Sequence, residues 1–163
     1  MDAVPVHEAG HALEILRSGG RLGEIRIGHK GNGTLGHAAY ITPENGATAE
    51  EKIVGKYRVA LAGAVAEKEI MGKVTGHGDL VGAVKYLTLY DRNDTLSALR
   101  AAARYAVSTE GTKQGQAEAF MAEAGDLVTF SDRERRAILH LAGVLQEKGA
   151  VCGIDAAILM EQG

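Results

Sequence analysis

The segment His7-Glu8-Ala9-Gly10-His11 has the residue types and the spacing to hold and use a metal ion. It lies in a stretch that predicts a helix, on which residues four apart share one face, about one 5.4 Å turn along the axis. Both imidazoles could then bind one zinc ion, with Glu8 beside them facing a water on the metal. Zinc lowers the pKa of such a water toward about 7, and a carboxylate can take its proton during attack on a carbonyl. The alternative interpretation is a surface helix that carries two unrelated histidines.

A catalytic zinc usually has a third protein ligand, and the residues alone leave its identity open. The metzincin pattern does not continue, because Glu14 stands where its glycine should be and Arg17 where its third histidine should be. Two carboxylates downstream compete for the role, Glu67 on a long predicted helix and Asp79 after a glycine-rich break. An aspartate after glycines is most often a helix N-cap, so spacing alone does not select Asp79.

The elements that must position these residues are mostly helices. Two alternating runs, at 23–28 and 35–41, flank an Asn-Gly pair and predict a β-hairpin or two adjacent antiparallel strands. The predicted fold class is therefore mainly α (α+β), with a small antiparallel β-hairpin or sheet after the first helix. Helical patterns cover residues 4–16, 48 or 49–71, 79–89, 94–107, 112–124, 131–148 and 154–160.

Length and composition set the limits of this interpretation. The 163 residues predict a single domain, 1–163, with an active-site part at about 1–90 and a helical C-terminal part at about 91–163. With 45% hydrophobic and 24% charged residues the chain can bury a sizeable core. A net charge of −3 with dispersed basic residues argues against a nucleic-acid surface.

Three features of the sequence bear on the cellular compartment of the protein. No stretch is apolar enough to span a membrane, and residues 1–13 do not have the charge pattern of a signal peptide. The single cysteine, Cys152, excludes an intrachain disulfide and is expected to be buried. These observations predict a cytoplasmic protein.

Ordered matches along the chain resemble the peptidase half of the FtsH-type, membrane-anchored AAA+ proteases. Residues His7–Leu13 look like the active-site helix of that family, and Leu61–Glu67 resembles its LAGRAAEE helix. Met71–Leu80 is similar to its FGEVTTGASNDL stretch, and residues 35–40 correspond to its LGYT strand. A weaker similarity covers the C-terminal helices at 142–160. The matches span nearly the whole chain, which a chance HExxH would not produce.

The resemblance implies a ligand set. It makes His7, His11 and Asp79 the zinc ligands and Glu8 the general base. Glu67, which matches a glutamate of the family motif, would bond a zinc-bound histidine, and a helix-surface carboxylate is the alternative of equal standing. The loop before Asp79 is shorter than in the family and contains His77, which becomes a rival or auxiliary ligand.

The function that follows is a zinc-dependent metalloendopeptidase. The substrate would lie extended against the edge of the second strand, where Leu35, Gly36, His37 and Tyr40 would border the groove. The chain contains no GxxxxGK[ST] phosphate loop, so ATP-independent cleavage of peptides or unstructured protein segments is expected. Whether the chain assembles into a homo-oligomer or works with a separate ATPase partner stays open.

Two other interpretations stay open as well. The chain could be a non-catalytic or regulatory protein-binding module that keeps the peptidase fold. It could also be a fragment of a longer ATPase-linked protein.

Overall fold

The computed structural model describes residues 1–28, 36–41 and 49–162, and at 36–41 and 49 it describes the backbone only. The described part is mainly helical, with a small antiparallel sheet that follows the first helix, which confirms the predicted fold class. The predicted hairpin turn at 30–34 and loop at 42–46 lie outside the described residues.

Ten elements and two short 3₁₀ turns make up the described chain. The helices are α1 (Ala3–Arg17), α2 (Ala49–Met71), α3 (Gly78–Leu89), α4 (Ser97–Thr109), α5 (Lys113–Ala124), α6 (Asp132–Lys148) and α7 (Gly153–Gln162). The strands are β1 (Arg21–Ile27), β2 (Gly36–Ile41) and β3 (Ala150–Val151), and the 3₁₀ turns are η1 (Asp94–Leu96) and η2 (Gly125–Leu127).

The sheet has one strand more than the sequence predicted. Its order is β2-β1-β3, and β1 pairs antiparallel with both neighbours. The two residues of β3 lie opposite Ile25 and Arg26. A two-residue strand has no alternating pattern to recognise, which is why the sequence did not show it. As a result, the chain after α6 returns to the strand that follows α1.

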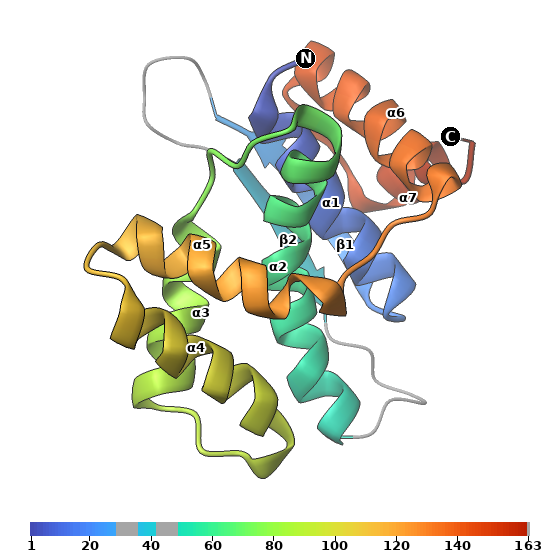
Figure 1. Cartoon of the computed structure of the whole chain (residues 1–163). Helices are drawn as coiled ribbons and strands as arrows, with labels where there is room; N and C mark the ends of the chain where they lie inside the picture. The colour runs from blue at the N-terminus through green and yellow to red at the C-terminus, as the bar shows by residue number, and fades with distance from the viewer. Residues whose placement is uncertain (29–35, 42–48, 163) are drawn as a thin grey trace.

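Two groups of helices lie on either side of α2 (Figure 1). Helix α1 packs along α2 and α6, while α7 covers β1. On the other side, α3, α4 and α5 pack on one another. One hydrophobic cluster of buried residues runs through both groups. Helix α2 therefore forms the wall against which both α1 and α3 are placed.

Helices α1 and α2 approach each other unusually closely at a glycine. A Cβ atom added at Gly10 would lie 2.6 Å from the Ala66 Cβ atom and 2.7 Å from the carbonyl oxygen of Ala62. The small residues along α2 leave this space, and Ala62, Ala64 and Ala66 are fully buried. The backbone of α1 consequently lies directly on α2 at the level of its two histidines.

The C-terminal end of α1 is tied to the start of α6. The buried Glu14 carboxylate accepts hydrogen bonds from Arg17, and Arg17 Nη1 also donates to the carbonyl oxygen of Thr129 (2.6 Å) and to Glu134 (2.9 Å). Glu134 in turn completes the capping box that Ser131 begins. Helix α1 is therefore held between α2 and α6 along its length.

The structure corrects the expected burial of the single cysteine, and it also bears on whether a helix could cross a membrane. Cys152 is exposed rather than buried, because it lies in the turn between β3 and α7. Within the described ranges, none of the helices is both long and apolar enough for a membrane crossing.

The close approach at Gly10 yields a prediction. We expect Gly10→Ala to lower the free energy of unfolding by about 1–3 kcal/mol, since a methyl group there overlaps the backbone of α2. Urea denaturation followed by circular dichroism measures this difference. Gly82→Ala is the matched control within α3, because an added Cβ atom there meets nothing within 4 Å. The control should be neutral or stabilising, and equal effects of both substitutions would contradict the packing described.

Candidate metal centre

Helix α1 places His7 and His11 side by side in the interface with α2. Both histidines are buried, and their rings meet edge to face with centroids 4.6 Å apart. Gly63 of α2 makes the space, because a Cβ atom there would lie 2.5 Å from Nε2 of His7 and 2.7 Å from Nε2 of His11. The two imidazoles therefore fit only because α2 has no side chain at this position.

Each histidine has one ring nitrogen occupied by an acceptor. His7 Nδ1 lies 2.6 Å from Glu67 Oε1, and His11 Nδ1 lies 2.5 Å from the carbonyl oxygen of Val59. A backbone carbonyl can only accept, so His11 Nδ1 carries the proton. Such bonds fix the ring orientation and leave Nε2 available as a metal ligand.

The two Nε2 atoms converge on the carboxylate of Asp79. Its Oδ2 atom lies 3.2 Å from His7 Nε2 and 2.9 Å from His11 Nε2. Ligand atoms around a tetrahedral zinc with bonds of about 2.0–2.1 Å lie about 3.3 Å apart, so these separations are close to those of a metal site. Asp79 is in the first turn of α3, after the N-cap residue His77, so it is not the N-cap that spacing alone suggested.

Glu67 connects the histidine to the loop that carries Asp79. This carboxylate is only 1% exposed, so it needs hydrogen-bond donors. Besides His7 it accepts bonds from the Thr75 N–H (2.8 Å), the Thr75 hydroxyl (2.9 Å) and the Gly76 N–H (3.2 Å). The surface-carboxylate alternative for Glu67 is therefore wrong. The loop begins at Gly72, whose φ of +79° is a left-handed conformation that favours glycine.

His7 lies between the carboxylates of Glu67 and Asp79, and these three groups shift one another's pKa values. Burial lowers the pKa of His7, but its hydrogen bonds to Asp79 and Glu67 outweigh burial and raise it to about 9. The bonds from His11 and His7 hold the pKa of Asp79 well below its usual range. Burial raises the pKa of Glu67, yet the bonds from His7 and Thr75 bring it below its ordinary value. Two ionised carboxylates therefore surround His7 and favour a positive charge between them.

Glu8 lies beside the histidine pair. It is buried, and one of its carboxylate oxygens is within 4.8 Å of a ring nitrogen of each histidine, so the three residues could hold a metal ion. A cavity of about 240 Å³ opens over His7 and Glu8. Its lining comes from the start of α1, the end of α2 and the loop into α3: Val4, His7, Glu8, Glu67, Thr75, Gly76, Gly78 and Asp79.

The structure does not bring His77 to the histidine pair. Its Nε2 atom faces helix α5, 3.4 Å from a carboxylate oxygen of Glu118. His77 and Asp79 lie on either side of Gly78 at the start of α3, and their side chains lie against different neighbours. An auxiliary ligand role for His77 is therefore not supported by its position.

The predicted substrate strand is described only in part. Leu35 lies outside the described residues, and for Gly36, His37 and Tyr40 the structure describes the backbone alone. These three residues belong to β2 and pair with Ile27, Arg26 and Leu22 of β1. Among the strands described, β2 lies at one edge of the sheet.

Several residues of the site were not found by sequence reasoning. The Val59 carbonyl is a backbone group, and any residue type could supply it. Thr75 and Gly76 act through backbone or short polar donors that have no sequence pattern. The sequence did contain a signal for Gly63. A glycine within a helix costs stability and often marks a place where another element packs closely.

Comparison with models of known protein families and with characterised proteins finds no match for this chain. The resemblance to the FtsH-type peptidases therefore rests on the motifs alone.

The role of Glu67 can be tested without a metal. In Glu67→Gln an amide nitrogen would face the donors of Thr75, and we expect the buried mismatch to lower the free energy of unfolding by about 1–3 kcal/mol. Hydrogen exchange should become faster at the amides of Thr75 and Gly76. Glu69→Gln, an exposed position on the same helix, is the control and should stay within about 0.5 kcal/mol of the parent. Unchanged protection at Thr75 in Glu67→Gln would contradict the assigned contacts.

Proposed function

We propose that the protein is a zinc-dependent metalloendopeptidase. The observation that carries the proposal is the convergence of His7 Nε2 and His11 Nε2 on the Asp79 carboxylate, with Glu8 beside them in an open cavity. Two imidazoles and one carboxylate are the ligand types of a catalytic zinc site with one open position. His7, His11 and Asp79 would hold the ion.

The donor set fits zinc on two counts. Both Nδ1 atoms already have acceptors, so each Nε2 atom can offer its lone pair to zinc, which on His7 would displace the proton that the raised pKa holds there. Two ionised carboxylates face the pair, and a divalent cation would supply the positive charge that they favour. When bound, zinc would polarise a peptide carbonyl and make a water acidic enough to attack it near neutral pH.

Glu8 would act as the general base. Its carboxylate is buried next to the proposed ligands and borders the cavity, where an attacking water and a peptide carbonyl could be held. It would accept the proton of the attacking water and pass it to the leaving amine. A purely structural metal site needs no carboxylate in this position, so Glu8 favours catalysis over the regulatory alternative.

The substrate would be an extended peptide or an unstructured protein segment. Strand β2 supports this, because an edge strand can pair with an extended chain. We assign no nucleotide to the reaction, and a separate ATPase would be required only for folded substrates. The motifs that resemble the FtsH-type peptidases, including His7–His11 and the stretch that ends at Leu80, support the same proposal.

The ligand role of Asp79 gives the first test. We expect Asp79→Asn to weaken zinc binding by more than about 100-fold, since loss of an outer-shell partner alone costs 10–100-fold. Competition with a zinc-binding dye measures the affinity. Asp155→Asn, an exposed position in the first turn of α7, should bind zinc like the parent chain. Equal affinities for Asp79→Asn and the parent would remove Asp79 from the ligand set.

The role of Glu8 gives the second test. Glu8→Gln should keep the fold and bind zinc, while its hydrolysis of casein falls by roughly 10²–10⁴-fold, the usual effect of a general base. Glutamine has nearly the same shape but cannot take the proton. Full activity of Glu8→Gln would refute the mechanism. A parent chain that binds zinc but cleaves nothing would favour the regulatory module.

A further inference from the structure

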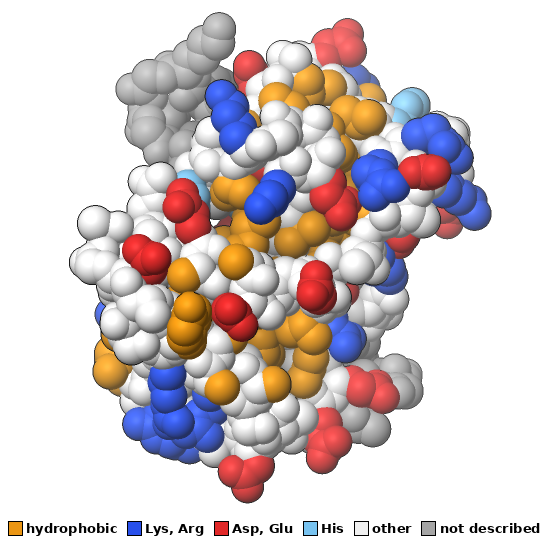
Figure 2. All heavy atoms as spheres, in the orientation of Figure 1, with side chains coloured by type: hydrophobic (Ala, Val, Ile, Leu, Met, Phe, Trp, Pro, Cys, Tyr) orange, Lys and Arg blue, Asp and Glu red, His pale blue; other side chains and the backbone are white. Residues whose placement is uncertain are grey.

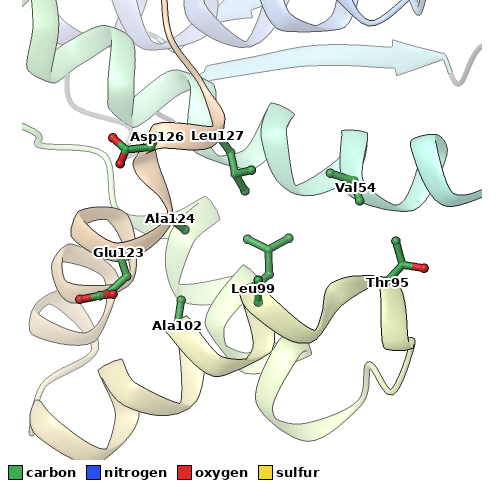
Figure 3. A pocket seen from close by; sticks show the side chains of 9 residues that line it. Val54, Thr95, Leu99, Ala102, Glu123, Ala124, Asp126 and Leu127 are labelled. Atoms are coloured by element: carbon green, nitrogen blue, oxygen red, sulfur yellow. The ribbon is translucent and has the colours of Figure 1, made fainter.

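A second hollow lies away from the histidines, between α2, α4 and the end of α5. It is a cavity of about 420 Å³, within the range of ordinary ligand pockets. Figure 3 shows Val54, Leu99 and Leu127 directed into the same space from three different segments. Ala102 and Ala124 complete the walls without filling them. The interior of the pocket is therefore apolar.

The rim of this pocket carries charge of one sign. Its two ionisable residues are Glu123 and Asp126, which both lie on the α5 side and are exposed. Within the described ranges, neither carboxylate has a hydrogen bond or an ion pair in the structure. On the same face of the molecule, hydrophobic side chains gather between the helices, with both acidic and basic groups around them (Figure 2). The pocket thus combines apolar walls with two carboxylates at its rim that form no ion pair with any described residue.

We propose that this pocket binds a peptide segment in which bulky aliphatic side chains are followed by lysine or arginine. The aliphatic side chains would displace water from the walls formed by Val54, Leu99 and Leu127. The basic side chains would lie at the rim beside Glu123 and Asp126, where charge complementarity selects the partner. The proposal is independent of the zinc chemistry, because no residue of the pocket belongs to the metal centre.

The probe is the peptide acetyl-Leu-Leu-Gly-Lys-Lys-amide, added to the full chain in the presence of EDTA so that no cleavage changes it. Methyl NMR of Val54, Leu99 and Leu127 reports binding. We expect saturable shifts at these methyl groups. A peptide with glutamate in place of lysine should bind about tenfold more weakly, and so should one with alanine in place of leucine.

Variants separate the walls from the rim. Ala98 is an exposed residue of the pocket lining, so Ala98→Phe should fill the space and abolish the shifts. Ala101→Phe, an exposed position on the same helix outside the lining, should leave binding intact. Glu123→Gln combined with Asp126→Asn should remove the preference for the basic peptide without loss of fold. Glu161→Gln on α7 is the control for a change of surface charge.

Three results would overturn the proposal. The first is the absence of saturable shifts with the basic peptide. The second is equal affinity for the basic and acidic peptides. The third is a concentration-dependent shift of the same methyl groups without peptide, which would make a second copy of the chain the occupant.

Discussion

The buried carboxylate of Glu67 is the contact on which the proposed site depends. It accepts a hydrogen bond from His7 on α1 and three more from Thr75 and Gly76 in the loop before α3. A carboxylate that is 1% exposed is costly unless all of these donors are present. One group on α2 therefore fixes the ring of His7 and also the loop that brings Asp79 to it. Asp79 itself is about half exposed, so it has little packing of its own to hold it there.

The packing of α1 on α2 makes this arrangement possible. Gly10 lets the two backbones meet, and Gly63 leaves the space that the imidazoles of His7 and His11 occupy. A larger residue at either position would push α1 outward and separate the Nε2 atoms from Asp79. Helix α6 holds the other side of α1 through the contacts of Arg17 with Glu134 and the Thr129 carbonyl. The site is therefore built on rigid helices, and only the loop at 72–77 must be ordered by polar contacts.

The sequence predicted those features that depend on local patterns. The helical periods, the Ser131–Glu134 capping box and the pairing of the two strands follow from neighbouring residues, and the structure has all of them. The His7–His11 spacing placed both imidazoles on one face for the same reason. The residues alone offered Glu67 and Asp79 as competing carboxylates, and only the family resemblance assigned their roles, because their positions depend on how α2 and α3 return to α1. The side chain of His77 lies against Glu118 of α5, a helix that arrives much later in the chain. No local pattern could have shown that contact, nor the two-residue strand β3.

The central claim is that His7, His11 and Asp79 together hold one zinc ion. Anomalous scattering recorded at the zinc edge, from crystals of the protein grown with zinc, tests it most directly. We expect a single strong anomalous peak between His7 Nε2, His11 Nε2 and the Asp79 carboxylate, with Glu8 beside it. A peak at other side chains, or no peak between the two imidazoles, would contradict it.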